Sequence, residues 1–186
     1  MRTSHLDPLK RQLRALDVVS PPAPWRRLAT IAVGGLLSIG FDRTSELLLV
    51  ISGAGRGVID CRTGGKVARD YDEYFGNEQF LEADGIGPLH GKIVPVSGFF
   101  GGGLPIATAD GWHVELVSLD WPLTDIFLID PSSSLYGAQY GKPAIFHKIG
   151  TELGLRACGF SYTGNSFVIA TSSDITVFTR WLNRDQ

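Results

Sequence analysis

The sequence has few of the residues that bind metals or form disulfides. Its two cysteines, Cys61 and Cys158, and its four histidines are spread over 186 residues without the spacing of a metal site. Two cysteines also do not match the disulfide framework of a small secreted domain, so a reducing compartment is favoured. We therefore expect a cytoplasmic protein that has neither a metal ion nor another cofactor.

Long apolar runs and a strong net charge are absent as well. No apolar stretch approaches the roughly 20 residues of a membrane helix, and the N-terminus lacks the continuous apolar core of a signal peptide. The formal net charge is -2 with 19% charged residues, which is typical neither of a nucleic-acid-binding chain nor of a disordered one. The sequence thus predicts a globular protein that binds neither nucleic acid nor a membrane.

The motifs of nucleotide binding and acyl transfer fail on their spacing. The glycines of residues 53–57 come one residue too close for a dinucleotide fingerprint, and a predicted strand follows them instead of a helix. The three glycines at 101–103 resemble the oxyanion loop of some esterases, but residues 159–164 have one residue too many for a nucleophile elbow. We therefore predict no catalytic residue, and a function other than catalysis is favoured.

Glycine is absent from the first 33 residues, and this part of the chain differs from the rest. Pro8 and a face of leucines predict a helix over residues 7–17, with Asp7 as its N-cap. The prolines of residues 20–24 end the helix and form an extended linker. Residues 1–27 hold six basic and two acidic side chains, so three alternatives arise: a solvated arm, which is favoured, an arm that packs against the acidic remainder, and an arm that reaches a partner.

All 23 glycines lie in the remainder of the chain, where they separate short apolar runs. Turn sequences such as Thr63-Gly64-Gly65 and Asp110-Gly111 between these runs favour hairpins of antiparallel strands. Residues 28–186 are therefore predicted to form a single mainly β domain of antiparallel, blade-like or meander sheets. Beyond the arm, short helical turns are expected only in residues 74–83 and 146–153.

Two segments that lie 119 positions apart share one pattern. Residues 39–58 and 158–177 each have a Gly-Phe pair, a threonine, an apolar run and a valine at matching positions. A repeat of this kind predicts a supersecondary unit that needs neighbours to bury its face. With a weaker third copy, the repeat units lie near 36–70, 92–118 and 155–181. A propeller-like set of sheets around a pseudo-axis fits the pattern, and a β-sandwich or barrel with an internal duplication is the alternative.

The hairpin of residues 58–67 resembles the outer hairpin of a β-propeller blade. Its sequence, VIDCRTGGKV, is similar to the repeats of quinoprotein-like propellers, in which a strand ends in Asp and a Thr-Gly turn returns the chain. The Trp-Asp and Gly-His dipeptides of WD40 blades are absent, and the hairpin implies no quinone cofactor. Over a longer span, residues 55–71 and 101–105 resemble a bacterial protein family to which no activity is assigned, and this resemblance implies a bacterial source.

An acidic and aromatic cluster is the strongest candidate for an interaction surface. Its residues are Asp70, Tyr71, Asp72, Glu73, Tyr74 and Phe75. Acidic groups steer association with a basic partner, and aromatic side chains anchor interfaces. The cluster lacks the alternating ligands and the central glycine of a calcium loop. A solvated loop is the alternative to a partner-binding surface.

Three further residues are candidates for binding a ligand. Arg56 places a cation on a tight turn, whereas His113 and Glu115 share one face of an alternating strand. The alternative for Arg56 is a hairpin turn without a ligand, and the alternative for His113 and Glu115 is the polar face of a strand.

The pattern as a whole favours a non-catalytic protein-interaction module on a rigid β scaffold. One form of this function is an immunity-type protein that binds a basic partner, and the sequence is also compatible with a homo-oligomer. The alternative is an enzyme or a small-molecule-binding protein with a site between β-sheets.

Overall fold

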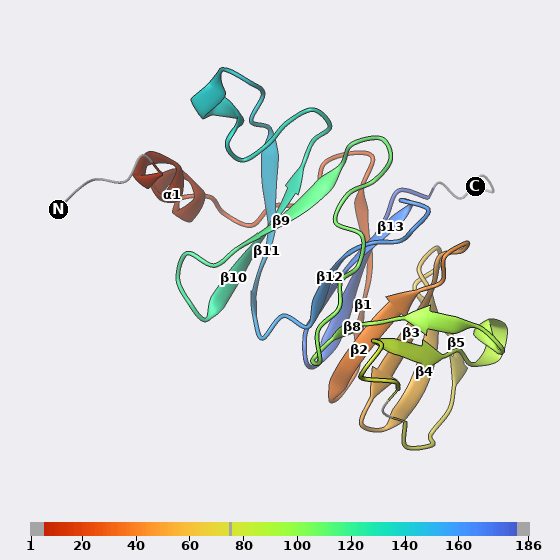
Figure 1. The fold of residues 1–186 in the computed structure, drawn as a ribbon. Helices are drawn as coiled ribbons and strands as arrows, with labels where there is room; N and C mark the ends of the chain where they lie inside the picture. The colour runs from red at the N-terminus through yellow and green to blue at the C-terminus, as the bar shows by residue number, and fades with distance from the viewer. Residues whose placement is uncertain (1–5, 75, 182–186) are drawn as a thin grey trace.

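Antiparallel strands dominate the fold, which confirms the mainly β class predicted from the sequence (Figure 1). The structure, a computed structural model, describes residues 6–74 and 76–181. These residues form one α-helix, two short 3₁₀ helices, three sheets of three or more strands and a two-stranded ribbon. Within the described residues no sheet closes on itself, so the barrel alternative is wrong.

A four-stranded sheet, named here the central sheet, brings together strands from the two ends of the chain. Its strands, in spatial order, are β1 (Arg26–Ala32), β14 (Asp174–Thr179), β13 (Ser166–Ala170) and β12 (Ala157–Phe160). All five residues of β13 are buried, which is the pattern of a strand covered on both faces.

A five-stranded sheet, named here the flap-side sheet, lies on one side of the central sheet. Its strands, in spatial order, are β5 (Gly65–Arg69), β4 (Gly55–Asp60), β3 (Leu47–Ser52), β2 (Leu36–Phe41) and β8 (Ser97–Gly98). Its outer face is covered by the flap, which consists of β6 (Glu82–Asp84), η1 (Gly87–Leu89) and β7 (Ile93–Pro95).

A three-stranded sheet, named here the helix-side sheet, lies on the other side. Its strands, in spatial order, are β11 (Phe146–Leu153), β10 (Leu123–Ile129) and β9 (His113–Val117), and η2 (Gly137–Tyr140) lies between β10 and β11 in the sequence. The helical turns predicted for residues 146–153 are wrong. This segment pairs with β10 over its whole length, because the buried apolar strand β10 needs hydrogen-bonding partners on both edges.

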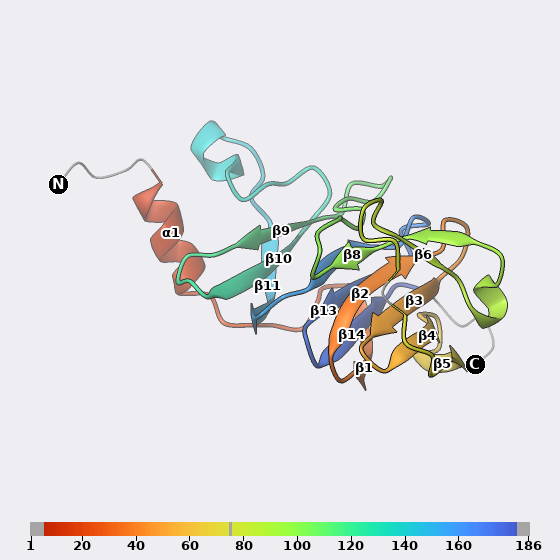
Figure 2. The ribbon, with the colours of Figure 1, turned by 60° about the horizontal axis from the view of Figure 1, so that its bottom comes forward.

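The three sheets are stacked face to face with the central sheet in the middle (Figures 1 and 2). One apolar core lies between the central and flap-side sheets, where Val168 and Phe41 belong to the same buried cluster. A second core lies between the central and helix-side sheets and contains Trp25, Phe160 and Ile126. Both faces of the central sheet are therefore buried, whereas each outer sheet needs a separate cover.

The N-terminal arm covers the outer face of the helix-side sheet. Helix α1 (Asp7–Arg14) buries Leu13, which is 3% exposed, in one cluster with Phe127 and Ile129. The arm thus packs against its own chain, which is one of the three predicted alternatives and not the favoured solvated arm. Asp7 lies in the first turn of the helix instead of at the N-cap, and the helix ends three residues earlier than the predicted 7–17.

Residue pairs that lie opposite each other in the flap-side sheet correspond to pairs in the central sheet whose numbers are 119 higher, with the exception of β1. Both sheets also have a β-bulge at the corresponding step, between β4 and β5 in the flap-side sheet and between β14 and β1 in the central sheet. The matching pairs are Gly40–Leu49 with Gly159–Val168, and Val58–Ala68 with Val177–Ala29. The edge strands β5 and β1 differ in origin: β5 follows β4 directly in the sequence, whereas β1 comes from the N-terminal part of the chain. Residues 92–118 contain β7, β8 and β9, which belong to three different sheets.

Candidate partner-binding loop

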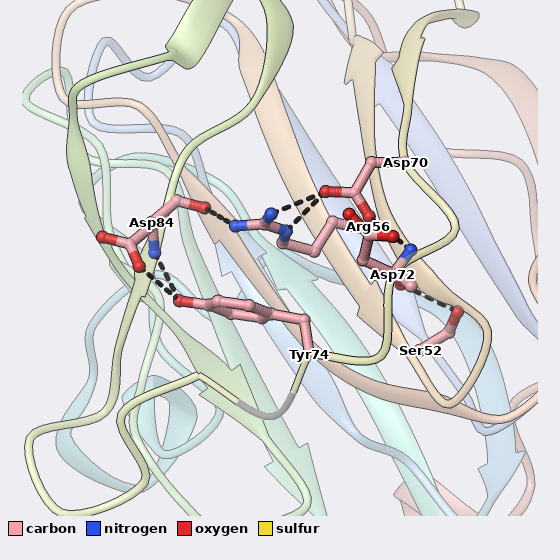
Figure 3. Close-up of polar contacts among 7 residues, drawn as sticks. Ser52, Arg56, Asp70, Asp72, Tyr74 and Asp84 are labelled. Carbon is pink, nitrogen blue, oxygen red and sulfur yellow. Dashed lines mark hydrogen bonds and ion pairs between the residues drawn. The ribbon is translucent and has the colours of Figure 1, made fainter.

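Arg56 ties three segments of the chain together. Its side chain extends from β4, and its Nε and Nη2 atoms donate hydrogen bonds of 3.0 and 2.6 Å to Oδ2 of Asp70 (Figure 3). Its Nη1 atom donates to the backbone carbonyl of Asp84 at 3.0 Å. All three nitrogens of the guanidinium group therefore have protein acceptors. The Arg56 and Asp70 side chains are 14% and 21% exposed, so this ion pair is largely shielded from water.

Tyr74 completes the cluster. Its ring lies 4.0 Å from the Arg56 guanidinium carbon, a distance that favours a cation–π interaction. The Tyr74 hydroxyl donates to a carboxylate oxygen of Asp84 at 3.1 Å and accepts from the Asp84 backbone N–H at 2.7 Å (Figure 3). We name Arg56, Asp70, Tyr74 and Asp84 the Arg56 cluster.

Two side chains of the Arg56 cluster have shifted pKa values. Burial alone would raise the pKa of Asp70, but hydrogen bonds from Arg56 and from the Asp72 backbone N–H, together with the Arg56 charge, lower it below its usual range. The pKa of Tyr74 is raised by burial and by the neighbouring Asp84 carboxylate. Near neutral pH the cluster therefore holds a charged carboxylate and a neutral phenol, which is the arrangement that its hydrogen bonds require.

Three of the predicted partner-binding residues project into solvent between the two ends held by the cluster. Tyr71 is 81% exposed, and Asp72 and Glu73 are exposed as well. The Asp72 backbone N–H donates to Oδ1 of Asp70 at 3.0 Å, which fixes the start of the loop. Asp70 and Tyr74 belong to the Arg56 cluster and are turned toward Arg56 instead of solvent. Phe75 lies outside the described residues.

His113 and Glu115 lie on β9 of the helix-side sheet. His113 Nε2 is 3.9 Å from Glu115 Oε1, and its Nδ1 lies 3.3 Å from the Gly111 carbonyl oxygen. Burial raises the pKa of Glu115, and the charge of His113 opposes this shift. Arg56 belongs to the flap-side sheet, on the far side of the central sheet. The three predicted ligand-binding residues are therefore not brought together.

A cleft lies between the central and flap-side sheets, and we name it the Lys66 cleft. Its volume is about 490 Å³, Val50 and Ile59 contribute to its apolar wall, and Lys66, Arg69 and Tyr71 also line it. Sequence analysis did not identify this site, because the residues come from separate strands. Gly57 lies within β4, and a glycine inside a strand often marks a close approach of a ligand or another backbone, but the sequence pattern places Gly57 before the predicted strand.

Asp84 was also missed by sequence reasoning. It enters the Arg56 cluster through its backbone carbonyl and N–H as well as its carboxylate, and backbone groups have no signal in a sequence.

Within residues 6–74 and 76–181, no group of three or more His, Cys, Asp or Glu side chains could hold a metal ion. No helix in this part of the chain is both long and apolar enough to cross a membrane.

Comparison with known proteins does not assign the chain to a family. No protein-family model matches the sequence, no curated protein is significantly similar to it, and no solved structure matches its fold.

Proposed function

We propose that the protein is a non-catalytic protein-interaction module that presents residues 71–73 to a basic partner. The observation that supports this proposal is the Arg56 cluster, which holds both ends of an exposed acidic and aromatic loop. An immunity-type protein that neutralises a basic toxin is one form of this function.

The geometry of the loop suits recognition because its ends are fixed before any partner arrives. Ordering a flexible loop costs free energy on binding, and a loop that is already ordered avoids this cost. The exposed Tyr71 ring offers a large anchor with few rotatable bonds, and the carboxylates of Asp72 and Glu73 attract a basic surface.

Arg56 is a positioning residue in this proposal. Three of its five N–H donors bind Asp70 and Asp84, and its guanidinium group lies against the Tyr74 ring, so the side chain is already engaged within the cluster. The role of the cation is to hold the loop in place through Asp70 and Tyr74.

We also infer that the flap-side and central sheets are two copies of one blade-like unit. Shared register and the shared bulge support this inference, since both follow from the same pattern of side chains. Such a scaffold is rigid, because each copy is packed against a neighbour.

A cytoplasmic location is proposed as well. Cys61 and Cys158 are both free and buried, and burial raises the pKa of Cys158 to about 12. Free thiols of this kind persist in a reducing compartment.

The proposal is tested by affinity capture from an extract of the source cells, followed by quantitative mass spectrometry. The full chain serves as bait beside three variants: Tyr71→Ala, Glu73→Lys and Asp17→Lys. We expect Tyr71→Ala to reduce capture of the specific partner by about tenfold, the effect of losing an aromatic anchor. Glu73→Lys should reduce it more strongly at low salt than at high salt.

Asp17→Lys is the matched control, since it reverses one exposed acidic charge outside the loop. It should leave capture unchanged. If all three variants retain the same proteins at wild-type amounts while keeping the wild-type circular dichroism spectrum, the loop is not a partner-binding surface.

A further inference from the structure

The Lys66 cleft has apolar walls and a cationic rim. It opens between the end of β1 in the central sheet and strands β4 and β5 in the flap-side sheet. Val33, Val50 and Ile59 are buried apolar residues of its lining. Lys66 and Arg69 are exposed and line the same space. The volume of about 490 Å³ lies within the range of about 300–1,000 Å³ that is typical of small-molecule sites.

Among the described residues, the two cations of the rim have no carboxylate partner. Lys66 Nζ donates to the Ala32 carbonyl oxygen at 3.4 Å, and Arg69 Nη2 donates to the Ala54 carbonyl oxygen at 2.6 Å. Within the described part of the chain, neither side chain forms an ion pair, and no acidic residue lines the cleft. The positive charge beside the apolar wall therefore lacks a compensating anion from the part of the protein that the structure describes.

A second cleft lies at the corresponding place between the helix-side and central sheets, and we name it the Arg27 cleft. Three of its lining residues lie 119 positions after lining residues of the Lys66 cleft: Ile169 after Val50, Thr176 after Gly57 and Phe178 after Ile59. Arg27 of β1 lies opposite Phe178 of β14 in the strand register, just as Lys66 of β5 lies opposite Ile59 of β4. The Lys66 cleft and the Arg27 cleft thus lie at equivalent positions on the flap-side sheet and the central sheet.

The Arg27 cleft differs in the two respects that decide ligand binding. Residues 18–21 of the chain form part of its wall, held by a 2.8 Å hydrogen bond from the Val19 N–H to the Lys148 carbonyl. Glu152 lines the same cleft and interacts electrostatically with Arg27. This cleft is therefore partly covered and contains its own anion, whereas the described residues give the Lys66 cleft neither a covering segment nor an acidic group.

A glycine also makes room in the Lys66 cleft. Gly57 occupies the position at which the central sheet has Thr176, whose hydroxyl forms a 3.2 Å hydrogen bond with Thr30. A Cβ atom on Gly57 would lie 3.5 Å from the Ala68 carbonyl oxygen, an ordinary contact. A larger side chain can therefore be placed there without a backbone clash and would project into the cleft.

We propose that the Lys66 cleft binds a small organic anion with an apolar body. The anionic group, a carboxylate or a phosphate ester, lies between Lys66 and Arg69, and the apolar body lies against Val50 and Ile59 between the sheets. Tyr71 adds an aromatic surface beside Arg69, whose guanidinium carbon is 5.0 Å from its ring. An extended peptide is a poorer fit, because Lys66 already uses the Ala32 carbonyl at the edge of β1.

The proposal is tested by titrating the isotope-labelled full chain and following its backbone amide signals by NMR. The probes are octanoate and octyl phosphate, which distinguish the two anionic groups. Acetate and inorganic phosphate test the charge alone, and octan-1-ol tests the apolar body alone. We expect saturable shifts at Gly34, Gly57 and Ala68 with at least one of the two amphipathic anions, and affinities at least tenfold weaker for the other three probes.

Two variants and one control separate this site from nonspecific binding. Arg69→Gln removes a charge-assisted interaction and should weaken binding by about tenfold. Gly57→Val fills the cleft and should abolish the shifts, whereas Lys142→Gln removes an exposed lysine elsewhere and should leave them unchanged. If octan-1-ol binds as tightly as the amphipathic anions, if neither anion shifts these amides, or if Arg69→Gln binds like the wild type, the proposal is wrong.

The outcome can be separated from partner binding by residues 71–73, although Tyr71 belongs to both the loop and the cleft. Glu73→Lys removes a charge needed only for the partner, since Glu73 does not line the cleft. This variant should bind the anion as the wild type does. Loss of anion binding in Arg69→Gln alone and loss of partner capture in Glu73→Lys alone would support the two proposals separately.

Discussion

At the scale of single residues, the glycine of the Gly-Phe pair has a definite steric role. A Cβ atom on Gly159 would lie 2.5 Å from Cβ of Leu104 and 2.8 Å from the carbonyl oxygen of Pro105. The same carbonyl accepts a 2.7 Å hydrogen bond from the Phe160 N–H. A Cβ atom on Gly40 would likewise clash with the carbonyl oxygen of Pro95. Glycine is thus required at both positions because another backbone segment lies directly against the strand.

We therefore predict that Gly159→Ala destabilises the protein by about 1–3 kcal/mol, the usual cost of overpacking a well-filled core. The backbone of Pro105 cannot move away without losing its hydrogen bond to Phe160. Urea-induced unfolding followed by circular dichroism measures the difference. Gly53→Ala is the matched control, since nothing lies within 4 Å of a Cβ at that position. Equal stabilities of the two variants would contradict the steric explanation.

Single residues of the candidate site were only partly predictable. Arg56 and Asp70 are each conspicuous in the sequence, but their ion pair joins positions 14 residues apart and depends on the pairing of β4 with β5. The exposure of Tyr71 agrees with a surface role, whereas Tyr74 is turned inward by its contacts with Arg56. Pattern alone does not distinguish two tyrosines three positions apart in one loop.

At the scale of elements, strands were predictable where apolar runs are bounded by turn residues. The run at 47–51 became β3, and the Thr-Gly-Gly turn joins β4 to β5 as expected. Residues 146–153 were assigned wrongly because their mixed sequence lacks a strand period, and pairing with β10 decides their structure. In the flap, β7 coincides with the short apolar run at residues 93–96, whereas β6 has no apolar run of its own and was not predicted.

One ion pair attaches the flap to the flap-side sheet. Asp42 follows β2, and its carboxylate accepts a 2.8 Å hydrogen bond from Lys92, which precedes β7 in the flap. Burial alone would raise the pKa of Asp42, but hydrogen bonds from Lys92, Ser45 and Thr44 outweigh it and lower the pKa to about 2. The charged form of Asp42 is therefore favoured by folding.

This shift predicts an acid-sensitive attachment of the flap. Because the pKa of Asp42 is lower in the folded chain than its ordinary value of 3.8, its contribution to stability is complete above that value and is lost as the pH falls through about 2. The difference in unfolding free energy between the wild type and Asp42→Asn should therefore be largest above pH 5 and shrink toward pH 2. Urea unfolding at a series of pH values measures it. A difference that stays constant across this range would exclude the mechanism.

At the scale of the whole molecule, the fold depends on a strand from the N-terminal part of the chain. Strand β1 pairs antiparallel with β14 from Arg26–Thr179 to Ala32–Asp174 and so completes the central sheet. Both apolar cores lie against this sheet. Helix α1 has a more local role, since it covers only the outer face of the helix-side sheet. The boundary predicted between residues 27 and 28 falls inside β1, because the basic residues that set it belong to this strand.

Two truncated chains test this difference between β1 and α1. Removal of residues 1–17 uncovers the cluster around Phe127 and Ile129, so we expect a folded protein with lower stability and increased binding of a hydrophobic dye. Removal of residues 1–33 also leaves the edge of β14 unpaired and removes Trp25 and Ile31 from the two cores. This second chain should lose cooperative urea unfolding altogether. If both chains unfold cooperatively with the same midpoint, β1 contributes no more to stability than the helical arm does.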